Sequence, residues 1–285
     1  MLSGVSLRQY RVRTLVKPLG SSAAARWLDA FTHWLHTAWA QCSFVGVCAR
    51  IAFFFLAATA AVHVLLLEKS GDLIGFGTLI DVDAEANLPT WFASFLAQAA
   101  AVVAFAIGEK DQRKNRLWWR GIAGMLFLMG MDEVASIHNM PSRRLGELVG
   151  VHDGWLMNAW ILPAILLCAG VACCYVRFLT RVPRCMACGF VLAAALYLTG
   201  AIGLEIIGSR VEYLAAGFDY DGRSVYSLDF ELIGVAEEAF EYAGMLLTLA
   251  ILIRRAKELG ASATIQFAQN DANVAEGDKS PAPLS

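Results

Sequence analysis

Six carboxylates lie inside, rather than at the margins of, segments of the chain that are otherwise apolar enough to cross a membrane. An ionised side chain at the centre of a membrane helix costs about 2.5–3.5 kcal/mol on insertion scales, and such residues usually mark functional sites. Carboxylates in this setting bind divalent cations, often together with histidine, or relay protons and cations; a structural hydrogen-bonded network is the third interpretation. The six residues are Asp132, Glu133, Glu205, Glu237, Glu238 and Glu241.

The spacing of these acids indicates which of them share a helix face. A helix turns by about 100° per residue, so the three glutamates of the segment 237–241 fall within one sector about 100° wide. His138 lies about 120° from Asp132 on a continuous helix. Because Pro141 disfavours helical geometry in the residue before it, we expect the last turn to unwind and to swing His138 inward.

The elements that carry these residues belong to a membrane protein. Of the 285 residues, 58% are hydrophobic and only 17% are charged, which excludes a soluble globular domain, a disordered chain and a small disulfide scaffold. The net charge of −2 argues against a nucleic-acid-binding protein. A membrane core needs about 20 apolar residues per helix. We therefore predict an all-α polytopic bundle of six transmembrane helices, at about 51–67, 91–108, 121–140, 155–177, 187–208 and 230–253.

The distribution of Lys and Arg predicts how this bundle is oriented. Most of the 23 basic residues fall in the N-terminal segment, in the connections at 109–120 and 177–184, and in the C-terminal tail. The positive-inside rule then places both termini in the cytoplasm. All six carboxylates, together with His63, consequently lie in the outer half of the bundle. We predict a multipass protein of the cell inner (plasma) membrane. The Arg-rich first 20 residues would also suit a mitochondrial transit peptide, so a mitochondrial membrane is the alternative.

The chain divides into three parts. Residues 1–50 form a basic cytoplasmic arm, in which 22–41 have the pattern of an amphipathic helix lying in the membrane interface. Residues 51–253 form the six-helix transmembrane domain. Residues 254–285 form a cytoplasmic tail whose composition is typical of disorder. The apolar face of the amphipathic segment consists of Trp27, Phe31, Trp34, Leu35, Ala38 and Trp39.

A second motif, Glu85-x-Asn87-x-Pro89-Thr90-Trp91, stands before the second predicted span. Asn87 can cap the helix, Pro89 suits its first turn, and Trp91 suits the interfacial aromatic belt. Glu85 and Asn87 could also face the acidic layer, so a functional role stays open beside the structural one.

Two other patterns favour structural interpretations. Cys185-x-x-Cys188 lacks the spacing of a zinc ribbon, and small thiols are ordinary in packed helices. His152 and Asp153 suit a helix cap before the fourth span better than a pair of metal ligands. The chain contains no G-x-S-x-G elbow, P-loop, H-E-x-x-H motif or Gly-rich dinucleotide turn.

The two motifs resemble a bacterial family of uncharacterised multipass membrane proteins over about residues 45–255. The resemblance rests on the motif at 85–91 together with Met131-Asp132-Glu133-Val134-Ala135-Ser136-Ile137-His138. It implies that Glu205 in a Gly-rich span and the segment Glu237-Glu238-Ala239-Phe240-Glu241 belong to the same set. The family usually has Glu after the motif's His, where this chain has Asn139, so one potential ligand is missing. The family implies no particular reaction.

A looser similarity links the chain to membrane hydrolases of the alkaline-ceramidase type. Those enzymes hold zinc within a helical bundle and place His and Asp near one bilayer face. They use several histidines and seven spans, whereas this chain offers two or three candidate histidines and six spans, so the similarity is an analogy. A carboxylate-rich site suits iron or manganese better than a histidine-rich zinc site.

These residues predict a membrane metalloenzyme that acts on a lipid-like or amphipathic substrate, with membrane lipid as its partner. The bound ion would be divalent iron, manganese or zinc, with Asp132 or Glu237 orienting the ligands or acting as acid and base. A cation- or proton-coupled transporter, and a non-catalytic membrane subunit whose partner contacts the amphipathic arm, are the alternatives. The predicted metal ligands are Glu133, His138, Glu205, Glu238 and Glu241.

Overall fold

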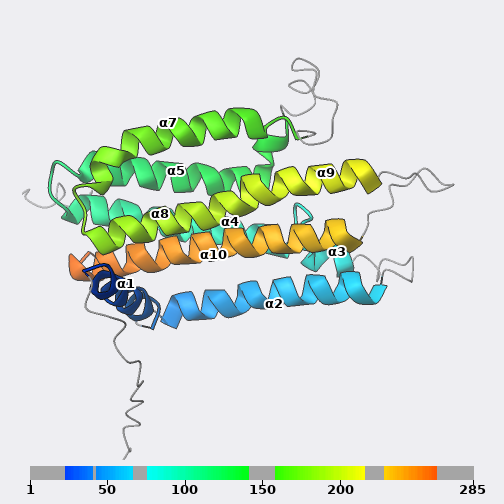
Figure 1. Cartoon of the computed structure of the whole chain (residues 1–285), viewed down its shortest axis with the longest axis horizontal. Helices are drawn as coiled ribbons and strands as arrows, with labels where there is room; N and C mark the ends of the chain where they lie inside the picture. Colours follow the sequence, from blue (N-terminus) through cyan, green and yellow to red (C-terminus); the bar gives the residue numbers. More distant parts are fainter. Residues whose placement is uncertain (1–22, 41–42, 67–75, 141–157, 216–227, 262–285) are drawn as a thin grey trace, which may run out of the picture.

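The computed structural model describes residues 23–40, 43–66, 76–140, 158–215 and 228–261, and the regular structure within these ranges is entirely helical. The long helices lie side by side and alternate in direction along the chain (Figure 1). In chain order the elements are α1 (Ala23–Ala40), α2 (Ser43–Leu66), the short α3 (Phe76–Ile80), α4 (Leu88–Lys110), α5 (Arg116–Ala135), the 3-10 turn η1 (Ile137–Asn139), α7 (Ile161–Leu179), α8 (Arg184–Leu198), the π-helix η2 (Thr199–Leu204), α9 (Glu205–Ala215) and α10 (Leu228–Glu258).

Each segment predicted to cross the membrane contains a long helix. Four helical runs are long and apolar enough to cross: Ser43–Val64 of α2, Leu88–Lys110 of α4, Ile161–Leu179 of α7, and Arg184–Leu214, which joins α8, η2 and α9. Helices α5 and α10 are also long, with 20 and 31 residues. They are less apolar because both carry the candidate functional acids.

Some predicted boundaries differ from the observed helices. Helix α10 continues to Glu258, past the predicted end of the sixth span at about 253. Helix α2 starts at Ser43, within the segment assigned to the cytoplasmic arm. The first 22 residues of the arm, His152 with Asp153, and the tail from 262 onward lie outside the described residues.

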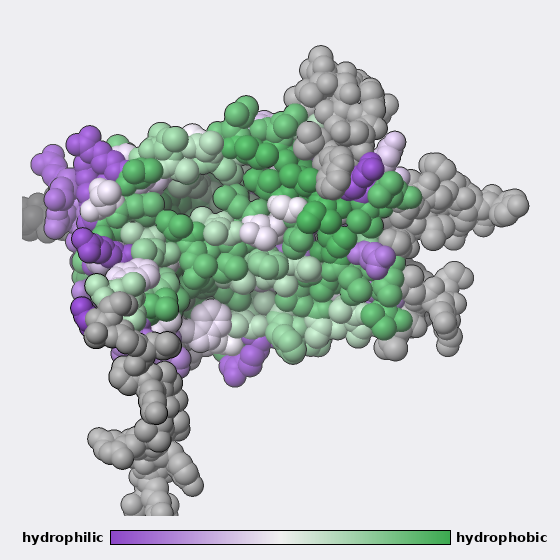
Figure 2. All heavy atoms as spheres, viewed as in Figure 1, coloured by the Kyte–Doolittle hydropathy of each residue, from purple (hydrophilic) through white to green (hydrophobic). Residues whose placement is uncertain are grey.

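The sides of the bundle are apolar. Figure 2 shows hydrophobic residues covering the lateral face, with hydrophilic side chains gathered at the end where α1 lies. In the spans of α7 and of α8–α9, only 11% of the most apolar stretch is buried, although its mean hydropathy is 2.0. Large exposed apolar faces are rare on proteins that stay in water, so these faces are suited to lipid or to another apolar surface.

The two ends of the bundle differ in charge. The basic end comprises α1, the start of α2, the connections at 110–120 and 177–187, and the last turns of α10. The acidic end comprises the last turn of α2 and residues 76–90, 132–140, 200–215 and 228–241. Within the part of the chain that the structure describes, Arg210 is the one Lys or Arg at the acidic end. The alternation of charge along the sequence therefore becomes a separation of charge in space.

Helix α1 lies across the basic end and packs on α10 (Figure 1). Arg254 donates from Nη1 to the carbonyl oxygen of Trp34 (2.8 Å) and to the hydroxyl of Thr37 (2.7 Å). Its guanidinium also lies 4.8 Å from the centre of the Trp34 ring. Trp27 and Trp39 remain exposed. Part of the helix thus packs on the bundle while these tryptophans stay uncovered, and its place in a membrane interface stays a prediction.

A buried polar network joins α4, α5 and α10 at the same end. Asp111 accepts hydrogen bonds from Trp119 Nε1 (2.6 Å) and from the backbone N–H of Gln112 (2.7 Å), and Arg255 Nη2 lies 3.6 Å from it. Burial alone would raise the pKa of Asp111. The hydrogen bonds and the Arg255 charge outweigh it and hold the pKa below its usual value.

Candidate functional site

Three of the predicted ligands line one internal cavity at the acidic half of the bundle. Glu133 of α5 faces Glu238 and Glu241 of α10, and the hydroxyl-bearing Tyr197 and Tyr242 complete the polar part of the wall. The cavity offers about 20 Å³ to the centre of a water molecule, which is room for one water or one ion. None of the described residues that line it is basic; the remaining wall consists of Ala93, Leu96, Ala97, Met129 and Met245.

The π-helix η2 brings α8 and α10 together beside this cavity. A Cβ on Gly200 would lie 2.6 Å from the carbonyl oxygen of Glu237 and 2.8 Å from Cγ of Glu241, so only glycine permits this approach. Three residues earlier on the same run, the Tyr197 hydroxyl comes within hydrogen-bonding reach of the Glu241 carboxyl group. Short π-helical segments often occur at functional sites.

Tyr242 fixes α10 from the other side. Its side chain is buried, and its hydroxyl donates to the carbonyl oxygen of Pro89 at 3.3 Å. Pro89 lies in the first turn of α4, which Asn87 caps by accepting from the backbone N–H of Thr90 at 3.0 Å. The capping role predicted for Asn87 and the first-turn position predicted for Pro89 are confirmed, and the same turn anchors a wall of the cavity.

Glu205 and Glu237 form a separate pair next to the cavity. Their carboxyl groups lie within hydrogen-bonding reach of one another. Asn158 donates from Nδ2 to Glu205 and, at 3.2 Å, to the hydroxyl of Ser209. Two carboxyl groups attract one another only when they share a proton or when a cation lies between them. The pair therefore needs a positive species at this point.

Asp132 and His138 form a further pair. The Asp132 carboxylate accepts from the backbone N–H of His138 (2.9 Å) and contacts its Nδ1 (3.0 Å). The expected unwinding of the helix is present, but it starts at Ser136, whose φ of 48° ends α5 in the left-handed region. This break comes before Pro141, which lies outside the described residues. The left-handed backbone of Ser136 is therefore the feature that ends the helix in the described part of the chain.

Glu85 connects the 81–87 loop to this turn. The Ser136 hydroxyl and Asn139 Nδ2 both donate to the Glu85 carboxylate, the latter at 2.7 Å. A glutamate at position 139 would instead place a second negative charge against Glu85. Asn139 thus replaces a potential ligand by a hydrogen-bond donor, and the sequence alone gave no sign of that partner.

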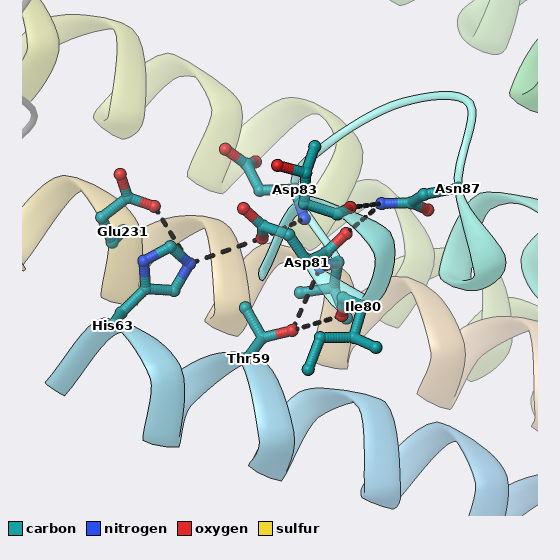
Figure 3. Close-up of polar contacts among 9 residues, drawn as sticks. Thr59, His63, Ile80, Asp81, Asp83, Asn87 and Glu231 are labelled. Atoms are coloured by element: carbon teal, nitrogen blue, oxygen red, sulfur yellow. Dashed lines mark hydrogen bonds and ion pairs between the residues drawn. The ribbon is translucent and has the colours of Figure 1, made fainter. Parts of the chain in front are cut away.

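One group of side chains at the acidic end was not predicted from the sequence to be a set of metal ligands. His63 of α2 lies between Asp81 of the 81–87 loop and Glu231 of α10 (Figure 3). Its Nε2 is 3.4 Å from Asp81 Oδ1 and 3.3 Å from Glu231 Oε2. Among the described residues, these form the one group of three His, Cys, Asp or Glu whose ligand atoms all lie within 4.8 Å of one another. We call it the His63 triad.

A buried threonine positions the loop part of the triad. Thr59, one turn before His63, donates to the carbonyl oxygen of Ile80 (2.8 Å) and accepts from the backbone N–H of Val82 (3.1 Å). Asp81 is the residue between these two anchors (Figure 3). In the sequence, this arrangement is indicated only by Thr59, a polar residue inside an apolar span and one turn before His63.

Asp83 links the triad to the glutamates of α10. A Cβ on Gly234 would lie 2.8 Å from Asp83 Oδ1, so the Asp83 side chain rests directly on the helix between Glu231 and Glu237. Desolvation by this packing, followed by the negative charges of Asp81 and Glu231, raises the pKa of Asp83 to about 6. Asp83 thus lies between the acids of the triad and the glutamates of α10 that are near the cavity.

The predicted ligands are therefore distributed over three adjacent places. Glu133, Glu238 and Glu241 share the cavity, Glu205 pairs with Glu237, and His138 pairs with Asp132. Cys185 and Cys188 are free thiols, and neither belongs to a group with metal-ligand spacing in the described ranges.

Comparison with known families agrees with the extent of this bundle. A family model described as a domain of unknown function (DUF8692) matches residues 49–256. The chain belongs to this family. The matched region begins within α2 and ends within α10, so it includes the cavity, both acidic pairs and the His63 triad, and it leaves out α1. No curated protein and no solved structure matches the chain.

Proposed function

We propose that this member of the family is an integral membrane metalloenzyme acting on a lipid-like or amphipathic substrate. Its six long helical runs would cross the cell inner membrane with both termini in the cytoplasm, and α1 would lie in the cytoplasmic interface. The basic end would then face the cytoplasm, as the positive-inside rule requires. The acidic end would occupy the outer half of the bilayer. Residues 1–50 and the C-terminal tail would flank this transmembrane domain.

The cavity lined by three glutamates carries the proposal. Glu133, Glu238 and Glu241 line a space of about 20 Å³ whose described lining contains no basic side chain. Their oxygens do not all lie within 4.8 Å of one another, so a bound ion would have to draw the three carboxylates together. Like charges in a desolvated site repel one another unless protons or cations compensate them. Carboxylate oxygens suit hard divalent ions, so iron or manganese fits the set better than zinc.

The adjacent pairs have defined parts in this proposal. Glu205 and His138 would supply further ligands at the edge of the cavity. Asp132 would hold the His138 ring by the hydrogen bond to Nδ1, as carboxylates commonly do for metal-binding histidines. Glu237, whose carboxyl group contacts that of Glu205, would act as acid and base toward the substrate. An amphipathic substrate is supported by the apolar faces of α7 and α8–α9, along which an acyl chain could lie.

Metal analysis of the purified protein tests this proposal. Wild type and the Glu238→Gln variant are isolated in detergent and their metal content is measured. The variant should lose about one metal equivalent per chain, since it removes a ligand charge without changing volume. Glu109→Gln is the matched control, because Glu109 lies at the basic end and pairs with Arg120 at 2.8 Å. Equal metal content in Glu238→Gln and wild type would refute the cavity as a metal site.

A cation- or proton-coupled transporter is the second candidate. The acids that continue from Asp83 through Glu237 to Glu133 support it, because carboxylate series of this kind mark proton and ion paths in membranes. In proteoliposomes, Glu238→Gln should then abolish ion-dependent flux, while Glu109→Gln should not. Flux that persists in Glu238→Gln would eliminate this candidate.

A further inference from the structure

We infer that the His63 triad binds a divalent transition-metal ion at a site of its own, separate from the cavity on which the proposed function rests. The triad joins three elements that are far apart in the sequence, namely α2, the 81–87 loop and α10. Its ligand set of one imidazole and two carboxylates offers mixed nitrogen and oxygen donors, which zinc, iron and manganese accept.

Two distances within the triad are those between ligands of one ion, and all three ligand atoms lie within 4.8 Å of one another. Both carboxylate oxygens approach the same ring nitrogen, at 3.3 and 3.4 Å from His63 Nε2. A single N–H points at one acceptor, and charge-assisted N–H···O contacts are shorter, about 2.7–2.9 Å. Ligands bound tetrahedrally at about 2.0–2.2 Å from an ion are about 3.3–3.6 Å from each other. The spacing therefore fits an ion between the three groups better than an ion pair.

The surroundings hold each ligand in place. Asp81 Oδ1 accepts from the backbone N–H of Asp83 at 3.2 Å, and Asn87 Nδ2 donates to the Asp81 carbonyl at 2.5 Å. Thr59 fixes the same loop to α2 (Figure 3). Supports of this kind orient the primary ligands of metal sites. The three side chains are only 15–22% exposed, which leaves access for a water as fourth ligand.

The triad and the cavity are two sites rather than one. Glu231 and Glu238 are seven residues apart on the continuous helix α10, hence about 10 Å apart along its axis. The ions of two-metal centres are about 3.5–4 Å apart. The triad also differs in chemistry, because a neutral imidazole with two carboxylates balances the charge of one divalent ion.

The experiment counts ions in full-length protein stripped with a chelator and then incubated with Zn²⁺ or Mn²⁺. His63→Ala and Asp81→Asn should each lose about one bound equivalent and the thermal stabilisation that Zn²⁺ gives to wild type. His63→Cys should retain Zn²⁺ because thiolate is a good zinc ligand, which guards against a folding defect. Asp229→Asn is the matched control, since it removes a neighbouring acid of the same helix turn.

The results separate this site from the cavity. If Glu238→Gln keeps the full metal content while His63→Ala loses one equivalent, the metal is bound at the triad and the cavity does not bind metal. If His63→Ala and Asp81→Asn bind as much metal as wild type, the triad is an ion pair of protonated His63 with two carboxylates, and the inference is overturned.

Discussion

Replacing Gly200 with alanine tests whether the cavity depends on the close approach of η2 to α10. A Cβ at this position would lie 2.6 Å from the carbonyl oxygen of Glu237 and 2.8 Å from Cγ of Glu241. Favourable contacts between non-bonded carbon atoms occur at about 3.5–4.0 Å. Because the oxygen belongs to helix backbone, relief requires that η2 and α10 separate by about 1 Å.

The expected loss of stability follows from two opposing terms. Overpacking of this kind costs about 1–3 kcal/mol, while alanine gains at most about 1 kcal/mol over glycine in a helix. With the full gain subtracted, the net loss is about 0–2 kcal/mol, which lowers the Tm by up to about 8 °C for a chain of this size. Gly203→Ala is the matched control in the same π-helix, because its Cβ would meet its nearest atoms only at 4.0 Å.

The assay combines thermal unfolding in detergent with metal analysis. Gly200→Ala should also lower the metal content of the cavity, because separation of the helices carries Tyr197 away from Glu241. The His63 triad should keep its ion, since a Cβ on Gly200 would press on Glu237 and Glu241 rather than on a triad residue. If Gly200→Ala unfolds at the same temperature as Gly203→Ala and binds as much metal, the close contact has no part in forming the cavity.

Two further predictions concern the network around Asp111. Trp119→Phe removes the 2.6 Å hydrogen bond to the buried carboxylate and should cost about 1.5–3 kcal/mol in a denaturation experiment, whereas Trp118→Phe, which keeps that bond, should cost less. Because folding lowers the pKa of Asp111, its stabilising contribution is complete above the usual carboxylate pKa and is lost as pH falls through the lower value of the folded state. Asp111→Asn should therefore be less stable than wild type at pH 7, with a difference that narrows on acidification; a constant difference down to pH 3 would contradict this.

The helices were predictable because each depends on local composition. Hydropathy located the six long runs, and Asn87 with Pro89 predicted the start of α4. Helix periodicity predicted that Glu238 and Glu241 share a face, and both line the cavity. These features need no knowledge of which helices are neighbours, whereas the meeting of Glu133 with them depends on how the helices pack.

The His63 triad was not predictable because its geometry depends on long-range packing. Asp81 lies in a loop outside every apolar span, and its position is set by hydrogen bonds to Thr59, 21 to 23 residues earlier. Glu231 lies at the margin of the last predicted span and is not among the six candidate acids. The π-helix at Gly200 also escaped prediction, since its register depends on the contact with α10.

The positions of the acid-bearing helices explain how so many carboxylates fit in an apolar bundle. Helix α10 packs against α2, α4, α8 and η2, so protein surrounds the face that carries Glu237, Glu238 and Glu241. The apolar helices α7 and α8–α9 instead have only 11% of their most apolar stretch buried. A surrounding lipid would therefore meet apolar side chains, while the carboxylates meet tyrosine, asparagine and each other. That arrangement would keep the acids from lipid but leaves their mutual repulsion, which bound cations at the cavity and at the triad would relieve. Stripping metal from wild type should consequently destabilise the acidic end more than the basic end, as hydrogen exchange of α10 near Glu238 and near Arg254 can measure; equal changes at both places would contradict this account.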